Sequence, residues 1–253
     1  METLNINNLL NREDEVIKIK QVLMEFEQNK HNLVTKRGLY IYGDPGSGKT
    51  TFITNILKEL NYDVIGYDAG DIRNKSIIDT ITKHNMADRN IMSMFHKEVK
   101  KIAIIMDEID GMNNGDKGGI NSLIKIIRPK KTKKQRLEES TLNIIICIGN
   151  YHIDKKIKEL MKVCHVVELK TATKTQMEIM INKLIPTFVS LDEKIKENLI
   201  HFIQGDLRKL NVIYDLYKNK ENLLNNNTLK DIFLTKSHND TTKQITKKLI
   251  NNN

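Results

Sequence analysis

The stretch that decides the fold is a short apolar strand that runs into a glycine-rich loop, Gly38-Leu39-Tyr40-Ile41-Tyr42-Gly43-Asp44-Pro45-Gly46-Ser47-Gly48-Lys49-Thr50. It satisfies the pattern G-x-x-x-x-G-K-[ST] through Gly43, Gly48, Lys49 and Thr50. In such a loop the glycines let backbone N–H groups approach a β-phosphate, the lysine reaches the β- and γ-phosphate oxygens, and the threonine hydroxyl holds Mg²⁺. The pattern therefore predicts a phosphate-binding loop.

The residues around the loop support this interpretation. An apolar strand precedes the loop, and a helix from Thr51 to about Leu60 follows it, so the positive helix N-terminus adds to the anion site. A chance match in a lysine-rich chain, or a phosphate site without catalysis, is the alternative, and the strand and helix argue against it. The residues predicted to bind the nucleotide are Gly43, Asp44, Pro45, Gly46, Ser47, Gly48, Lys49, Thr50 and Thr51.

A second buried strand ends in two acids. The run from Lys101 to Met106 is almost wholly apolar and is followed by Asp107 and Glu108. Ligands bind at the carboxyl edge of an open α/β sheet, where these acids would lie. We expect Asp107, with Thr50, to hold Mg²⁺, and Glu108 to orient and deprotonate the water that attacks ATP. Two acids that merely cap a following helix are the alternative, which a preceding phosphate loop disfavours.

A third apolar strand, from Asn143 to Ile148, ends in Gly149 and Asn150. A polar side chain at that tip could reach between the γ-phosphate and the attacking water. A lone asparagine after a strand is also a common turn residue, so the position alone leaves both interpretations open.

Composition limits the class of protein. The formal charge of +9 over 253 residues favours a polyanionic partner such as nucleic acid, with a merely soluble basic surface as the alternative. Cys147 and Cys164 are too few for a disulfide framework and are predicted to be buried thiols in a reducing compartment. The apolar runs are far shorter than the ~18 residues of a membrane span. We therefore expect an intracellular protein, in the nucleus or the cytoplasm, with no membrane partner.

The pattern of elements changes along the chain. We predict an α/β nucleotide-binding domain over residues 1–170, a helical lid domain over 171–235 and a polar tail over 236–253. Within the first domain, helical spacing predicts a helix from Asn11, its cap, to about Gln28. A strand at 63–67 and helices at 76–83 and 87–99 are also expected. In the second domain, capping boxes that start at Thr173 and Ser190 predict helices near 174 and 191, followed by helices at 206–217 and 229–234.

Taken together, the phosphate loop, Asp107-Glu108, Asn150 and Gly205-Asp206-Leu207-Arg208 resemble an AAA+ ATPase. The resemblance implies an α/β fold with a parallel five-stranded sheet flanked by helices, followed by a small all-helical lid. It also implies that Asn150 is the first sensor and that Arg208, from the lid, is the second sensor on the γ-phosphate. An arginine suits that role because it is always charged and can fork onto phosphate. A surface ion pair is the alternative for Arg208.

Within that family the chain most resembles the large subunit of replication factor C, a clamp loader. The resemblance is carried by Asp71-Ile72-Arg73-Asn74-Lys75-Ser76, by Ile105-Met106-Asp107-Glu108-Ile109-Asp110-Gly111-Met112, and by Asp116-Lys117-Gly118-Gly119-Ile120. It implies ATP-dependent loading of a sliding clamp onto primer-template DNA, together with small AAA+ clamp-loader subunits. The chain ends after the lid, so the resemblance also leads us to expect no collar domain.

The same resemblance suggests contacts. Arg73 and Lys75 match a segment that faces DNA, and Met92 and Phe95 match an apolar plug that contacts the clamp, although their spacing is equally compatible with this protein's own core. A basic stretch is predicted to be a loop, either at DNA or simply solvated. Its basic residues are Arg128, Lys130, Lys131, Lys133, Lys134 and Arg136.

One expected residue is missing. Small clamp-loader subunits carry Ser-Arg-Cys before the last strand, and this chain has Lys162-Val163-Cys164 there, so it lacks that arginine finger. We therefore expect it to receive a finger from a neighbour and to hydrolyse ATP slowly by itself. Two alternatives remain. Asn11-Arg12-Glu13-Asp14-Glu15 resembles the start of origin-recognition-type initiators, and a nucleotide-binding scaffold without turnover is possible, although Glu108 argues against it.

Overall fold

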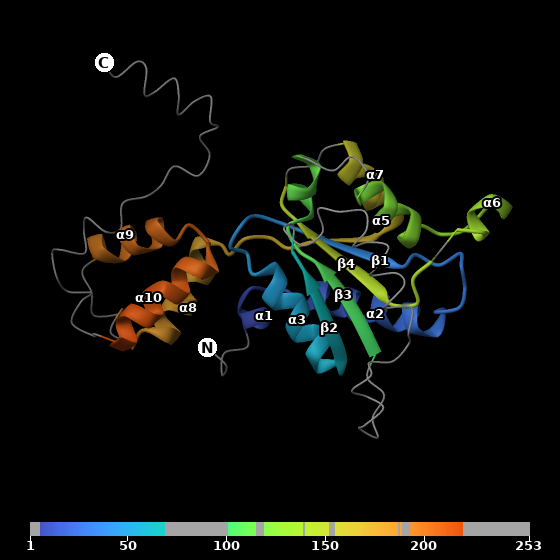
Figure 1. Ribbon diagram of the computed structural model, residues 1–253. Coiled ribbons are helices and arrows are strands. Elements are labelled where there is room, and N and C mark those ends of the chain that lie inside the picture. The colour runs from blue at the N-terminus through green and yellow to red at the C-terminus, as the bar shows by residue number, and fades with distance from the viewer. Residues whose placement is uncertain are drawn as a thin grey trace, which may run out of the picture. The chain divides into compact units, whose positions relative to one another are not determined.

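The computed structural model describes residues 6–68, 101–114, 119–138, 140–151, 155–186, 188 and 193–219 (Figure 1). The chain divides into two compact units, with the boundary between Thr171 and Ala172. The helices expected at 76–83, 87–99 and 229–234 and the tail at 236–253 lie outside the described residues. So do Arg73, Lys75, Met92 and Phe95.

The first unit is built on a parallel sheet of five strands in the order β2-β3-β4-β1-β5, as predicted (Figure 1). The apolar run before the phosphate loop is β1, which lies between β4 and β5. The strands are β1 (Gly38–Tyr42), β2 (Tyr62–Tyr67), β3 (Lys101–Met106), β4 (Ile144–Gly149) and β5 (His165–Glu168).

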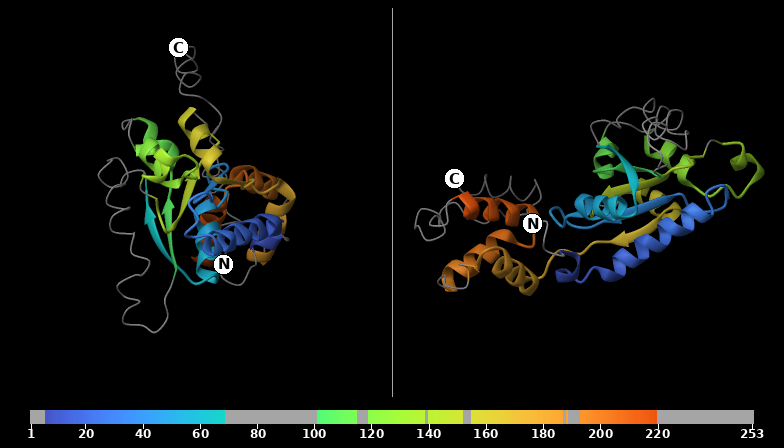
Figure 2. Two further views of the ribbon diagram at one scale, coloured as in Figure 1. Left: turned by 90° about the vertical axis from the view of Figure 1, so that its right-hand side faces the viewer. Right: turned by 90° about the horizontal axis from the view of Figure 1, so that it is seen from below.

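Helices cover both faces of this sheet (left view of Figure 2). One apolar cluster joins the sheet to α2 and α3, and a second joins it to α5 and α7. Alternation along β1 sends Leu39 and Ile41 into the first cluster and Tyr40 into the second. The helices of this unit are α1 (Ile6–Leu9), α2 (Glu13–Gln28), α3 (Lys49–Glu59), the 3-10 helix η3 (Ile109–Asn114), α5 (Gly119–Ile127), α6 (Lys133–Arg136) and α7 (Lys155–Val163).

The start of α2 differs from the prediction. The residue at the N-cap is Arg12, not Asn11, and its side chain makes no capping hydrogen bond. Asn11 instead has a φ of 52° in the turn before the helix. The reason is tertiary, because the Arg12 side chain is buried and bonded to the phosphate loop, which determines where the helix begins.

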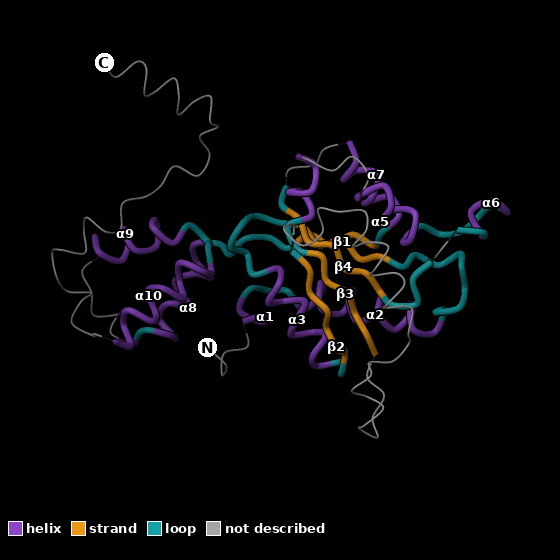
Figure 3. Tube along the Cα trace, viewed as in Figure 1, coloured by secondary structure: helices purple, strands orange, loops and turns teal. Residues whose placement is uncertain are grey.

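The described part of the second unit contains helices and no strands (Figure 3). They are α8 (Lys174–Leu184), α9 (Glu193–Ile203) and α10 (Leu207–Asn219). The capping box of Thr173 and Gln176 is confirmed, whereas Ser190 lies outside the described residues. Leu210 and Ile213 of α10 are fully buried.

The end of β1 lies very close to the chain that follows β5. The N–H of Leu169 donates to the carbonyl of Tyr42 at 2.7 Å, which extends the pairing of β1 with β5 by one residue. A Cβ atom built on Gly43 would lie 2.2 Å from the Leu169 carbonyl oxygen. No side chain fits at Gly43, so the first glycine of the loop is required by strand pairing as well as by phosphate binding.

Replacing Gly43 by alanine should therefore force β1 and the Leu169 backbone apart. We expect Gly43→Ala to lower the free energy of unfolding by about 1–3 kcal/mol and to weaken ATP binding, because the loop would move. Gly66→Ala is the matched control, since a Cβ on that strand glycine meets nothing within 4 Å. Denaturant unfolding and nucleotide titration measure both effects. Equal stability and equal affinity in the two variants would contradict this role for Gly43.

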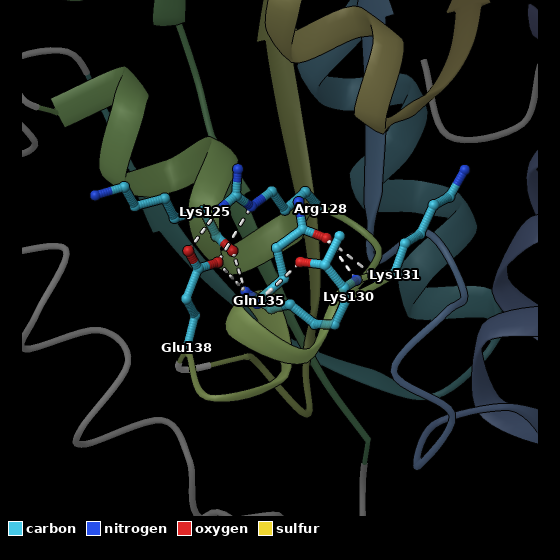
Figure 4. A network of polar contacts seen from close by, with 7 residues as sticks. Lys125, Arg128, Lys130, Lys131, Gln135 and Glu138 are labelled. Atoms are coloured by element: carbon cyan, nitrogen blue, oxygen red, sulfur yellow. Dashed lines mark hydrogen bonds and ion pairs between the residues drawn. The ribbon is translucent and has the colours of Figure 1, made fainter.

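The basic segment after α5 is not the plain loop that the sequence predicted. Thr132 and Gln135 form a capping box at the start of α6. Glu138 accepts hydrogen bonds from Arg128, at 2.5 Å, and from Lys130, at 3.2 Å, so these two cations have an internal partner (Figure 4). Two of the six basic residues are thus committed to structure. The other four, Lys131, Lys133, Lys134 and Arg136, are exposed.

Buried cations brace the amino ends of β1 and β4. Lys130 is 1% exposed, and its Nζ donates to the carbonyl of Lys125 at 2.5 Å as well as to Glu138. The Lys130 N–H donates to the Leu33 carbonyl at 2.7 Å. Arg37, also 1% exposed, donates to the carbonyls of Thr141 and Lys30. These bonds join the segment that leads into β1 to the segment that leads into β4.

Glu138 should stabilise the fold in a pH-dependent way. Hydrogen bonds from Arg128, followed by that from Lys130, lower the pKa of Glu138 to about 2. A carboxyl with a lowered pKa stabilises the folded state above its ordinary pKa of about 4.5, and that contribution is lost as the pH falls toward 2. Glu138→Gln should cost about 1–3 kcal/mol at pH 7, because it leaves buried Lys130 without its counter-charge.

Denaturant unfolding of Glu138→Gln and of the wild type at several pH values measures this. The difference between them should be constant above about pH 5 and shrink below it. Glu59→Gln is the control, because Glu59 is 62% exposed in its 2.6 Å pair with Lys20, and its loss should cost roughly 0.5 kcal/mol or less. A difference for Glu138→Gln that does not change with pH would show that its charge is unimportant.

Candidate nucleotide-binding site

The predicted site residues of the first unit meet at one edge of the sheet. The loop follows β1, Asp107 and Glu108 follow β3, and Asn150 follows β4. Because the strands are parallel, their carboxyl ends share this edge, which is where open α/β sheets bind ligands. The fold thus brings together residues from three separate stretches of sequence.

The loop itself has the geometry of an anion site. Gly46 and Gly48 have φ values of 80° and 82°, in the left-handed region that favours glycine. Gly48 is the N-cap of α3 and offers no capping side chain. The first N–H groups of α3 therefore have no side-chain cap at this position, so they and the positive end of the helix dipole can serve a phosphate.

Lys49 links the loop to the end of β4. Its Nζ donates to the carbonyls of Gly43, at 3.0 Å, and Asp44, at 2.9 Å. It also donates to Oδ1 of Asn150 at 3.2 Å, across 101 positions of sequence. The lysine predicted to bind phosphate and the asparagine predicted as first sensor are thus in direct contact.

Thr50 and Asp107, the two predicted magnesium ligands, are also in contact. Thr50 Oγ1 donates to Asp107 Oδ2 at 2.6 Å. Mg²⁺ prefers hard oxygen ligands, and in phosphate-transferring sites it takes only one or two from the protein, with water and phosphate as the rest. A hydroxyl and a carboxylate at this distance fit that requirement. Within the described residues no group of three His, Cys, Asp or Glu side chains could hold a metal without such help.

Glu108 lies on an unusual backbone. It is exposed and has a φ of 51°, which is uncommon outside glycine. Its N–H donates to Asp107 Oδ1 at 2.9 Å, and its carbonyl accepts from the Gly111 N–H at 2.8 Å. The chain therefore turns sharply after β3. Strained backbone of this kind often occurs at functional sites, which agrees with the role expected for Glu108.

Asp110 was missed as a site residue. It lies in η3, and its Oδ2 accepts a hydrogen bond from Nδ2 of Asn150 at 3.0 Å. The sequence did contain a signal, because Asp110 follows Glu108 by two residues in the stretch that resembles replication factor C. Spacing alone could not show which side chain it would contact.

Arg12 was missed as well. Its guanidinium donates to the carbonyls of Ser47 and Lys170, each at 2.9 Å, and lies 5.8 Å from the centre of the Phe52 ring. The side chain is only 4% exposed, and burial lowers its pKa to about 10, so it remains charged at neutral pH. Arg12 thus holds the backbone of the phosphate loop against the chain that follows β5.

Tyr151 anchors the chain just after Asn150. Its hydroxyl donates to Glu168 Oε1 at 2.5 Å, and its ring meets the Tyr42 ring edge-on, with the centroids 5.4 Å apart. The bond to Glu168 and partial burial raise the pKa of Tyr151, so the hydroxyl keeps its proton. These contacts tie the end of β4 to the ends of β1 and β5.

The remaining predicted residues lie elsewhere. Arg208 belongs to the second unit, where it is exposed and its N–H donates to Asp206 Oδ1 at 2.8 Å, so its role as second sensor stays a prediction. Val163 ends α7 and packs against the core, while Lys162 is exposed.

Cys147 and Cys164 are buried free thiols, as predicted, and burial raises the pKa of Cys164 to about 12. Among the described helices, none has the length and apolar character of a membrane span.

Comparison with known proteins agrees with this geometry. Three of the similar curated proteins are replication factor C subunits. Subunit 1 of Saccharomyces cerevisiae is 28% identical over 224 residues, which is 81% of this chain and 25% of the yeast protein. The large subunit of Nanoarchaeum equitans is 28% identical over 75% of this chain and 40% of its own length, and that of Methanococcus aeolicus is 29% identical over 76% and 37%. The chain therefore spans less than half the length of these relatives.

A solved structure shows the same fold. A point mutant of RuvB from Thermotoga maritima matches with a TM-score of 0.52 and 14% identity, over 86% of this chain and 69% of that one. Residues 39–171 match the profile of the ATPase family associated with various cellular activities. This match begins in β1 and ends at the boundary of the first unit, so it includes every site residue described above except Arg12 and Arg208. The chain belongs to the ATPase family associated with various cellular activities (AAA).

Proposed function

We propose that this chain is a clamp-loader ATPase subunit, similar to the large subunit of replication factor C, that binds and hydrolyses ATP to help load a sliding clamp onto DNA. The observation that carries the ATPase part is the meeting of Lys49, Thr50, Asp107 and Asn150 at one edge of the sheet. The similarity to replication factor C large subunits supports the clamp-loader part, and with it the proposal that the chain works at an intracellular replication site.

Each residue at this edge has a distinct proposed task. The backbone N–H groups of the loop and the Lys49 ammonium bind the β- and γ-phosphates. Thr50 and Asp107 hold Mg²⁺, which, when bound, neutralises charge on the phosphate oxygens. Glu108 accepts a proton from the attacking water, and Asn150 orients that water. Arg208 contributes a forked positive charge from the second unit.

Binding and turnover should therefore depend on different residues. Lys49→Ala should weaken ATP binding, because it removes the cation that compensates the phosphates. Glu108→Gln should keep the binding affinity and abolish hydrolysis, since an amide cannot accept the proton. Nucleotide titration and phosphate release measure the two quantities. Thr54→Ser is a control, because the one hydrogen bond described for the Thr54 hydroxyl is to the Thr50 carbonyl of the same helix, at 2.7 Å. Equal loss of binding in both site variants would contradict these roles.

The proposed partners are small AAA+ subunits, a sliding clamp and primer-template DNA. Met92 and Phe95 are proposed clamp contacts, and Arg73 and Lys75 are proposed contacts to DNA phosphates. Both proposals rest on resemblance to the large subunit of replication factor C. The exposed Lys162 and core-packed Val163 support a chain that gives no arginine finger, because neither side chain can fork onto phosphate.

Turnover should consequently depend on partners. Alone, the chain should bind ATP but hydrolyse it slowly, and an arginine finger supplied by a neighbour should accelerate hydrolysis by ~10³-fold or more. The measurement is phosphate release as a function of protein concentration, and then with candidate small subunits added. Fast hydrolysis that rises with self-association would mean that an arginine of this chain acts in a homo-oligomer, which would contradict the proposed arrangement.

A further inference from the structure

Asn150 lies between two charged side chains. Its Nδ2 donates to Asp110 Oδ2 at 3.0 Å, and its Oδ1 accepts from Lys49 Nζ at 3.2 Å. Asp110 comes from η3, Asn150 from the end of β4 and Lys49 from the start of α3. A continuous hydrogen-bonded chain therefore runs from η3 to the phosphate loop.

This arrangement permits only one orientation of the Asn150 amide. An ionised carboxylate can only accept hydrogen bonds, and an ammonium can only donate them. The NH₂ group must therefore face Asp110, and the carbonyl oxygen must face Lys49. If the amide turned over, both contacts would become repulsive. The chemistry of the two neighbours thus assigns the nitrogen and oxygen of the amide.

Of the two neighbours, Asp110 is the one that can keep its hydrogen bond to Asn150 both with and without bound nucleotide. Lys49 is proposed to bind the β- and γ-phosphates, which would draw its ammonium toward the nucleotide. No such task is proposed for Asp110. Its position is also confined, because a Cβ atom on Gly149 would lie 3.5 Å from Asp110 Oδ1, so the carboxylate lies directly beside the end of β4.

Asp110 has one oxygen without a partner. Its Oδ2 accepts from Asn150, whereas Oδ1 is buried and has no hydrogen-bond partner in the described part of the chain. A buried oxygen without a partner costs free energy, which offsets part of what the bond to Asn150 contributes to stability. The one hydrogen bond described for the Asp110 carboxylate is therefore the bond to a site residue.

We propose that Asp110 is a positioning residue that fixes the orientation of the Asn150 amide for ATP hydrolysis. Asp110 keeps the amide oxygen directed toward the phosphate loop, where it can accept a hydrogen bond from the attacking water, and it keeps the NH₂ group turned away. The inference rests on the proposed ATPase function for its kinetic consequence. The orientation itself does not depend on turnover.

The first test follows the Asn150 side-chain amide directly by NMR. The full-length wild type should show one NH₂ pair with slowed hydrogen exchange, identified by its absence in Asn150→Ser. In Asp110→Ala this pair should exchange at the rate of a free amide, whereas in the control Asp14→Ala, an exposed acid of the first turn of α2, it should not change. An unchanged Asn150 pair in Asp110→Ala overturns the inference, whether or not the protein hydrolyses ATP.

The second test separates positioning from folding. Asp110→Ala should remain folded and keep its affinity for ATP, but its kcat should be lower by about 10-fold or more, because the Asn150 amide is no longer held in place. Asp110→Asn should lower kcat less, because its side chain can accept as well as donate and fixes the Asn150 amide less strictly. The double variant with Asn150→Ala should be no slower than the slower single variant, since both changes remove one function. Additive losses, or a wild-type kcat in both Asp110 variants, overturn the inference. A wild type that does not hydrolyse ATP while the NMR change occurs refutes the proposed function and leaves the positioning role intact.

Discussion

The close approach of β1 to the chain after β5 is the constraint on which the site depends. The Leu169 N–H bonds to the Tyr42 carbonyl, and the space that this leaves at Gly43 cannot hold even a methyl group. The loop begins at this point, so its direction is determined by strand pairing before any phosphate contact. Arg12 strengthens the same junction, because one guanidinium binds the carbonyls of Ser47 in the loop and Lys170 after β5.

From that junction the site is built by pairs of complementary groups. Thr50 bonds to Asp107, and Lys49 bonds to Asn150, which bonds to Asp110. Each pair joins segments that follow different strands, so polar contacts connect these segments at the carboxyl edge of the sheet. Glu108, at the sharp turn directly after Asp107, is exposed. A rigid set of partners and one accessible acid is the arrangement expected where water must be activated next to bound phosphate.

Part of the basic charge is structural. Arg12, Arg37 and Lys130 are each at least 95% buried and donate hydrogen bonds to backbone carbonyls. These residues count toward the formal charge of +9 but are not available to a polyanion. Total charge therefore overstates the surface that could bind nucleic acid, and the exposed cations around α6 are a better measure of it.

The fold class and most of the site residues could be predicted from the amino-acid sequence. The apolar runs predicted β1, β3 and β4. The loop pattern, Asp107, Glu108 and Asn150 identified the residues that meet at the sheet edge, because each follows a strand and the carboxyl ends of parallel strands lie at the same edge. The capping box that begins at Thr173 likewise predicted the start of α8. These features depend on neighbours within a few residues, which the sequence displays.

The contacts between distant segments could not be predicted from the sequence and are seen only in the folded structure. Asn11 looked like a helix cap, but burial of Arg12 against the loop moved that position by one residue. Arg128 and Lys130 looked like solvated or DNA-facing cations, but both form ion pairs with Glu138. Asp110 gave no indication of its partner, which lies 40 positions away. The physical reason is the same in each case: a charged side chain takes its role from the donor or acceptor that folding places beside it, and local sequence does not specify that neighbour.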